Sequence, residues 1–296
     1  MSVLEINNLS KSYGKIKALD GLSVTIEAGN VYGILGPNGS GKTTTLAIIL
    51  NILRQDSGDY TWFNGEYGDK YRLKIGSILE TPNFYPYMNA LENLEVVRQI
   101  KRADKVDFME LLELVNLSHR VKSAFRTYSL GMNQRLAIAA TLIGNPKVLI
   151  FDEPTNGLDP QGIAEVREIL TRITGQGNSV IMASHILDEV EKICSHVAIL
   201  KKGQLLATGP IGQIINNDMT IEIAALDMLE LRGVLSEKTY VKTVKELPQW
   251  IECTVANEVD ISQFSKDMYE SGLLPTRLVA RRRRLEEEFL EITRNG

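Results

Sequence analysis

The sequence predicts an α/β protein of two domains, and two observations carry this prediction. Short apolar runs alternate with segments of helical spacing over residues 1–215, as expected for parallel strands joined by helices. After a loop rich in glycine and asparagine, residues 219–296 continue with strand and helix patterns, which predict a small C-terminal α+β domain. A chain of 296 residues, 44% hydrophobic and 24% charged, is long enough for both.

A glycine-rich loop lies between an apolar strand, residues 31–35, and a segment of helical spacing, residues 44–53. Its residues Gly36-Pro37-Asn38-Gly39-Ser40-Gly41-Lys42-Thr43 fit the phosphate-loop pattern. Glycines let backbone N–H groups surround an anion, Lys42 adds a positive charge, and Thr43 offers a hydroxyl to Mg²⁺. A chance glycine-rich turn is the alternative, but both flanks match the motif. We therefore expect a P-loop NTPase core that binds a nucleoside triphosphate.

The N-terminal segment, residues 3–26, shows short alternating runs separated by glycines, which predict antiparallel strands. Tyr13 lies between these strands, where its ring can stack on an adenine base or simply pack against the protein. Residues 58–65 are typical of another hairpin, and residues 75–80 of a buried strand that ends at Glu80.

Residues 88–144 change to helical spacing and predict a helical insertion. Within it Ser129 precedes a helix, with Gly131 two places on. A serine at this place is a good helix N-cap, and the helix N-terminus can also bind an anion. Taken alone, this segment favours the cap.

Charged side chains follow two of the apolar strands. Asp152 and Glu153 end the strand at residues 147–151, and His185 directly follows the strand at residues 179–184. Because the carboxyl ends of parallel strands meet at one edge of a sheet, these residues share the edge where ligands bind. Asp152 can hold Mg²⁺, Glu153 can accept a proton from water, and His185 can donate to a terminal phosphate. The alternatives are two acids that begin a loop and a structural histidine.

The C-terminal domain is expected to contain strands and helices but no nucleotide motif. The expected strands are 220–224, 240–244 and 250–255, and the expected helices are 261–270 and 284–293. The basic run at residues 281–284 is followed by Glu286-Glu287-Glu288, which predicts a solvated helix start with pairing inside the helix. A contact with a partner or a lipid is the alternative.

Charge and cysteine content exclude some classes of function. A net charge of −4 and a pI near 5.6 argue against a general basic surface for nucleic acid. Cys194 and Cys253 show neither disulfide nor zinc spacing. With no signal peptide and no apolar stretch of bilayer length, we expect a cytoplasmic chain.

Residues 1–210 together resemble the nucleotide-binding subunit of ATP-binding cassette (ABC) transporters. Gly36 to Thr44 resembles its Walker A motif, and Asp152 with Glu153 resembles the end of Walker B. Other matching residues are Tyr13 as the adenine-stacking aromatic, Asp159 as the D-loop aspartate and His185 as the switch histidine. The signature segment is Tyr128 to Arg135; Leu130 and Met132 depart from the family pattern, while its phosphate-contacting residues, Ser129 and Gly131, remain.

Three features resemble those of the bacterial exporter ATPases that include bacitracin-resistance pumps. They are the variant signature, Glu80 in place of the family's glutamine, and the acidic C-terminal helix. The resemblance implies ATP and Mg²⁺, with Thr43, Asp152 and Glu80 as metal ligands, although Glu80 can equally be a solvated loop acid. It also implies a homodimer or heterodimer that drives separate membrane permease subunits, at the inner face of the cell membrane. The alternative is a soluble ABC ATPase acting on nucleic acid or ribosomes, which the single cassette and acidic pI disfavour.

Overall fold

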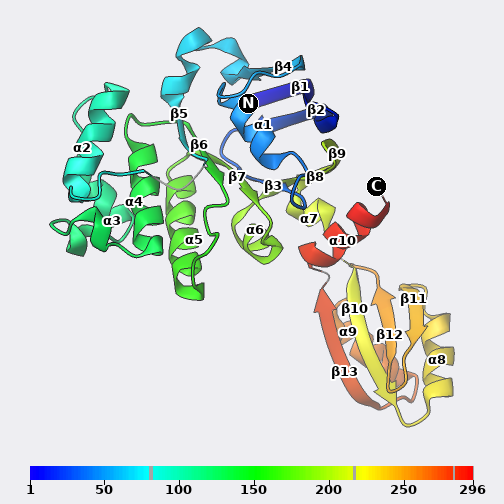
Figure 1. The fold of residues 1–296 in the computed structure, drawn as a ribbon. Coiled ribbons are helices and arrows are strands. Elements are labelled where there is room, and N and C mark those ends of the chain that lie inside the picture. The colour runs from blue at the N-terminus through cyan, green and yellow to red at the C-terminus, as the bar shows by residue number, and fades with distance from the viewer. Residues whose placement is uncertain (80–82, 216–217, 283, 296) are drawn as a thin grey trace. The chain divides into compact units, whose positions relative to one another are not determined.

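The computed structural model describes residues 1–79, 83–215, 218–282 and 284–295. The chain forms two compact units, one of Met1–Ile211 with the C-terminal residues from Ile292, and one of Gly212–Glu291. Each unit has its own sheets and its own buried core (Figure 1). Among the described residues, no helix is both long and apolar enough to cross a membrane.

A six-stranded sheet forms the centre of the first unit, in the order β5-β6-β7-β3-β8-β9. The strands are β3 Val31–Leu35, β5 Ile75–Ile78, β6 Val148–Asp152, β7 Ser179–Ser184, β8 His196–Lys201 and β9 Gln204–Pro210. All neighbours pair in parallel except β8 and β9. β3 and β7 are buried along their length, as their apolar runs predict. β5 is an edge strand and only half buried, which corrects the expectation of a fully buried strand.

Helices cover both faces of this sheet. They are α1 Lys42–Ile49, α5 Pro160–Gly175 and α6 Leu187–Ile193. A short helix, α7 Ile211–Ile214, follows β9 at the boundary of the first unit. Ile34 and Ile150 share one core cluster with the apolar side chains of α1. On the other face, a methyl group built on Gly33 would lie 2.8 Å from Cγ1 of Val190 in α6, so β3 needs glycine there. The predicted P-loop NTPase architecture is confirmed.

A three-stranded antiparallel sheet lies at the N-terminal end, in the order β2-β1-β4. Its strands are β1 Ser2–Tyr13, β2 Ile16–Glu27 and β4 Ser57–Trp62. The hairpin expected at residues 58–65 is wrong, because one strand there pairs with β1 and then enters the short 3-10 turn Phe63–Gly65. Gly58, the second residue of this strand, has positive φ, and a Cβ there would lie 2.3 Å from the carbonyl oxygen of Asn8. It therefore marks a close contact with β1, and not the arm of a hairpin.

The helical insertion contains three helices, α2 Ala90–Lys101, α3 Phe108–Leu114 and α4 Leu130–Leu142. Each begins at a polar N-cap, and the side chains of Asn89, Asp107 and Ser129 accept backbone N–H bonds there. The predicted insertion is confirmed, and so is the cap at Ser129.

Lys101, the last residue of α2, closes the other end of α4. Its ammonium donates to the carbonyl oxygens of Ala140, Thr141 and Ile143, at 3.0, 3.1 and 3.0 Å. The last carbonyls of a helix have no partner within the helix, so a cation there stabilises it. Burial lowers the pKa of Lys101 to about 8, and the side chain is still mostly charged at pH 7.

The second unit is a four-stranded antiparallel sheet in the order β11-β12-β10-β13. Its elements are β10 Met219–Ala225, α8 Met228–Glu237, β11 Val241–Glu246, β12 Ile251–Val255, α9 Ile261–Glu270 and β13 Pro275–Arg282. This βαββαβ sequence with its strand order is the split βαβ arrangement. Ile221 and Ile251 pack with Phe264 of α9 and Leu231 of α8 in one core.

Two elements of this unit, α8 and β13, are absent from the sequence prediction. The basic run at residues 281–284 is therefore partly misassigned, because Arg281 lies in β13 and not at a helix start. Arg281 pairs with Glu252 of the sheet at 3.1 Å and with Glu287 of α10, Leu285–Asn295, at 3.4 Å. The helix predicted at 284–293 is confirmed as α10.

Replacing Lys101 tests the closure of α4. Lys101→Met keeps the apolar stem but leaves three helix-end carbonyls without their donor, so we expect a loss of about 1–3 kcal/mol of unfolding free energy. Urea unfolding at pH 7 measures it, with Lys105→Met, which removes an exposed lysine nearby, as the control. A loss no larger than that of the control contradicts the capping role.

Candidate functional site

The phosphate loop joins β3 to α1 and is folded tightly upon itself. A Cβ on Gly36 would lie 2.3 Å from the hydroxyl of Ser40 and 2.4 Å from the carbonyl oxygen of Leu200. Gly39 adopts φ +77 and has open space beside it. Only glycine fits the first position, and the second lets the backbone approach a ligand without a side chain in between.

Lys42 is buried inside the curve of this loop. Its ammonium donates to the carbonyl oxygens of Gly36 at 2.8 Å and Pro37 at 3.4 Å. Burial lowers the pKa of Lys42, and the nearby carboxylates of Glu153 and Asp152 oppose that shift. A buried cation at the start of a helix is suited to bind phosphate oxygens.

Thr43 and Asp152 meet across the sheet. The Thr43 hydroxyl donates to Oδ2 of Asp152 at 2.7 Å. Oδ1 of Asp152 is buried and, among the described residues, has no hydrogen-bond partner. The Ser40 hydroxyl is likewise buried and has no partner among these residues. Burial raises the pKa of Asp152, against the bond from Thr43. This pair fits Mg²⁺, which binds proteins through few oxygen ligands and takes others from substrate phosphates and water. A fuller cage is not expected, and the described residues contain no cluster of three or more acidic, histidine or cysteine ligands.

Glu153 and His185 form a second pair at this edge. Nδ1 of His185 lies 2.8 Å from Oε2 of Glu153, and the His185 amide donates to the same oxygen at 3.4 Å. Glu153 has a left-handed backbone, φ 51, and its amide bonds to the carbonyl of Ala183 in β7. Unusual backbone conformations of this kind cluster at functional sites. The structure therefore brings together Lys42 and Thr43 with the three residues predicted at the strand ends.

The other predicted residues form a separate group. Ser129, Gly131 and Asp159 line a hollow of about 420 Å³ between the first turns of α4 and α5. The side chains of Ser129 and Asp159 cap their own helices, accepting from Met132 at 3.3 Å and Gly162 at 2.8 Å. In the part of the chain that the structure describes, no hydrogen bond or ion pair joins this group to the phosphate loop.

Two predicted residues remain. Tyr13 ends β1 with 50% of its surface exposed, so the ring is accessible for stacking. Glu80 lies outside the described residues.

Sequence reasoning missed the residues that support the second group. Arg135 of α4 is buried, donates to the carbonyls of Val115 and Asn116, and pairs with Glu165 of α5 at 3.3 Å. An arginine in an otherwise apolar helix is a signal that could have been used. Glu165 carries no such signal, because it is one of several acids on an amphipathic helix.

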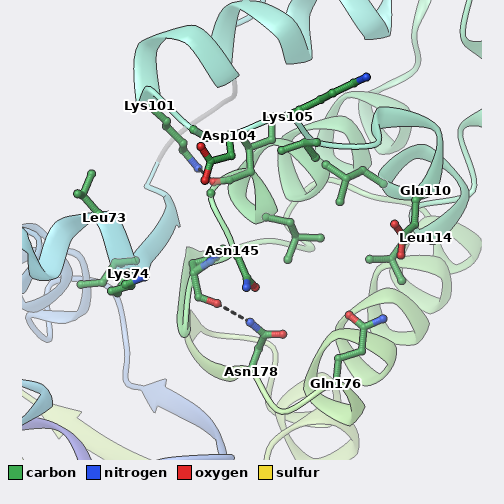
Figure 2. Close-up of a pocket in the computed structure, with 18 of the residues that line it drawn as sticks. Leu73, Lys74, Lys101, Asp104, Lys105, Glu110, Leu114, Asn145, Gln176 and Asn178 are labelled. Atoms are coloured by element: carbon green, nitrogen blue, oxygen red, sulfur yellow. Dashed lines mark hydrogen bonds between the residues drawn. The ribbon is translucent and has the colours of Figure 1, made fainter.

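The cavity in Figure 2, of about 850 Å³, lies at the opposite edge of the sheet. Ile75, Pro146 and Asn178 line it, and these residues begin β5 or precede β6 and β7. None of the predicted site residues lines it. Ligands of open α/β sheets bind at the carboxyl ends of the strands, so this cavity is not the nucleotide site.

Comparison with known families agrees with the geometry. Residues 19–156 match the family model described as ABC transporter. The chain is 36% identical to the uncharacterized ABC transporter ATP-binding protein YhcH of Bacillus subtilis, over 99% of this chain and 96% of the relative. It is 30% identical to the bacitracin transport ATP-binding protein BcrA of Enterococcus faecalis, over 99% and 97%. The lantibiotic transport ATP-binding protein SrtF of Streptococcus pyogenes is 37% identical, over 74% of this chain and 99% of the relative.

Solved structures show the same core. The ADP conformation of MJ1267, an ATP-binding cassette of an ABC transporter, superposes with a TM-score of 0.64 at 28% identity, over 72% of this chain and 92% of that one. The dimeric structure of MJ0796, a bacterial ABC transporter cassette, gives 0.61 at 27% identity, over 70% and 98%.

Asp152→Asn tests the electrostatics of the strand ends. Because burial raises the pKa of Asp152, the folded chain binds more protons than the unfolded chain between the two pKa values. The free energy of unfolding therefore falls as pH rises through this window, and the full destabilisation is present at pH 7. Asn keeps an acceptor for Thr43 without the charge, so the nucleotide-free variant should be more stable than the parent chain at pH 7, with a smaller difference at pH 4. Thermal unfolding at pH 4 and pH 7 measures this. A variant that is less stable at pH 7 contradicts the account.

Proposed function

Because the chain belongs to the ATP-binding proteins of ABC transporters, which hydrolyse ATP to drive transport, we propose that it is the ATPase subunit of an exporter. One observation supports the assignment of its residues most strongly. Lys42 and Thr43 of the phosphate loop lie at the same sheet edge as Asp152, Glu153 and His185. We assign the nucleotide domain to residues 1–215 and an accessory domain to residues 219–296.

ATP binds with its phosphates in the loop from Gly36 to Thr44. Backbone N–H groups and the Lys42 ammonium bind the phosphate oxygens, and Tyr13 stacks on the adenine. Thr43 and Asp152 hold Mg²⁺, with Glu80 as a further oxygen ligand. When bound, Mg²⁺ neutralises charge that develops on the phosphates.

Hydrolysis depends on Glu153 and His185. A Glu153 oxygen accepts the proton of a water molecule as that water attacks the terminal phosphorus. The bond from this phosphorus to the bridging oxygen breaks, and ADP and phosphate leave. Nδ1 of His185 orients the Glu153 carboxylate, and the imidazolium form, which has a proton on both ring nitrogens, can also donate from Nε2 to a terminal phosphate oxygen.

A second ATPase chain completes each site. Ser129 and Gly131 line a hollow with Asp159, and no residue of the phosphate loop lines it, which supports a role at a nucleotide held by another chain. In a head-to-tail dimer, the N-terminus of α4 from one chain meets the ATP held by the other. The dimeric MJ0796 cassette supports such an arrangement, as a homodimer or a heterodimer.

Transport requires separate membrane permease subunits. With these the ATPase lies at the inner face of the cell membrane, and closure of the dimer drives substrate movement. The names of BcrA and SrtF, for bacitracin and lantibiotic transport, support an exporter. The substrate is selected by the permease.

Glu153→Gln separates binding from hydrolysis. The amide keeps the shape of the side chain but cannot accept the proton, so hydrolysis should fall by at least about 100-fold while ATP binding is kept. The variant should then accumulate as an ATP-bound dimer in size-exclusion chromatography. Lys42→Ala is the contrasting variant, because it should weaken ATP binding itself. Turnover at the parent rate by Glu153→Gln rejects the assignment of Glu153.

Removal of residues 219–296 tests the division into domains. The second unit has its own core, and SrtF matches with only 74% of this chain. Residues 1–215 should therefore remain folded, although the truncation also removes the few C-terminal residues, from Ile292, that belong to the first unit. We expect the ATP affinity of the truncated chain to stay within about threefold of the full chain. A fluorescent nucleotide titration measures it, with circular dichroism to confirm folding. A folded truncated chain that does not bind ATP contradicts the division.

A further inference from the structure

The first turn of α4 and the segment that leads into α5 touch through two leucine side chains. Leu130, the first residue of α4, has 48% of its surface exposed, yet its Cδ2 would lie 3.2 Å from a Cβ built on Gly157. Leu158 makes the reciprocal contact, with its Cδ2 3.8 Å from a Cβ built on Gly131. Each leucine therefore lies against a glycine of the other segment.

A buried arginine joins the same helices one turn further on. The Arg135 side chain is 10% exposed, and its Nε lies 3.3 Å from Oε2 of Glu165, which is 28% exposed. Nε also points at the carbonyl of Gly131 at 3.4 Å, so the guanidinium contacts the start of α4 and the side of α5 together. Removing one partner of such a pair leaves a charge poorly compensated.

These five residues, Leu130, Arg135, Gly157, Leu158 and Glu165, form what we call the α4–α5 contact. We propose that the α4–α5 contact makes the first turns of the two helices one rigid body, which presents Ser129, Gly131 and Asp159 together to the second ATPase chain. Leu130 and Arg135 are then positioning residues. The inference rests on the proposed function for one point, that the surface which this rigid body meets belongs to a second ATPase chain.

The side chain at position 130 supports this inference. A glycine at this position would leave Gly157 and the hollow beside it uncovered. Gly157 has φ +76, so it cannot supply the missing side chain itself without strain. The turn at Gly157 is thus ordered by packing against the Leu130 side chain of α4.

Hydrogen–deuterium exchange of the nucleotide-free full-length chain tests the rigid body directly. Leu130→Ala, on α4, should speed exchange of the amides at residues 156–163 by at least about fivefold, because their packing partner is lost. Leu158→Ala should have the reciprocal effect on residues 130–135. Leu130→Met, which keeps an apolar side chain of similar volume, should retain the parent rates, as should Leu226→Ala, which truncates a leucine that is 95% exposed in the other unit. Exchange within about twofold of the parent chain in both alanine variants overturns the proposal.

The consequence for assembly is measured in the Glu153→Gln background. Leu130→Ala and Glu165→Gln should each weaken the ATP-bound dimer by about tenfold in analytical ultracentrifugation, while the ATP affinity of the single chain stays unchanged. Combined, they should weaken it by less than the product of the two effects, since either one frees α4 from α5. Full additivity, or an unchanged dimer, contradicts joint positioning. A Glu153→Gln chain that remains monomeric in ATP overturns the proposed function instead, and the exchange rates then decide the α4–α5 contact alone.

Discussion

The hydrogen bond from Thr43 to Asp152 is the contact on which the nucleotide site depends. It joins the first turn of α1 to the end of β6, and in the sheet β7 lies between β6 and β3, the strand that leads into the phosphate loop. The bond thereby fixes the loop relative to Glu153, the next residue after β6. At this buried edge the Asp152 carboxylate lies near the Lys42 ammonium. Burial raises the pKa of Asp152 and lowers the pKa of Lys42. Such an edge is unfavourable for the empty protein and favourable for a ligand that supplies both phosphate oxygens and a metal.

The sequence was sufficient to predict this half of the site because its elements obey local rules. β3, β6 and β7 are apolar because both of their faces are buried, and polar side chains at their ends must then lie at one edge. The phosphate loop needs glycine for reasons of backbone conformation and space, and these can be read directly from residue types.

Other features depend on tertiary contacts that leave no local pattern. β4 was mistaken for a hairpin because Gly58 serves its close approach to β1, a strand distant in sequence. The sequence does not reveal β13, because Arg277 and Arg281 pair with Glu222 and Glu252 across the sheet, whereas the run at residues 281–284 beside acidic residues predicts a solvated helix start. The partners of Arg135 on α3 and α5 are likewise set by packing.

We propose that a single chain holds two incomplete sets of phosphate-binding groups, one at the strand ends and one at the start of α4. Mixing two variants tests whether a second chain joins them. Lys42→Ala disables the first set, and Ser129→Arg disables the second by placing a bulky side chain at the helix start. If the site forms between chains, a mixed dimer contains one intact site, and the mixture should hydrolyse ATP faster than the two variants do separately. A rate equal to the sum of the separate rates contradicts a site shared between two chains.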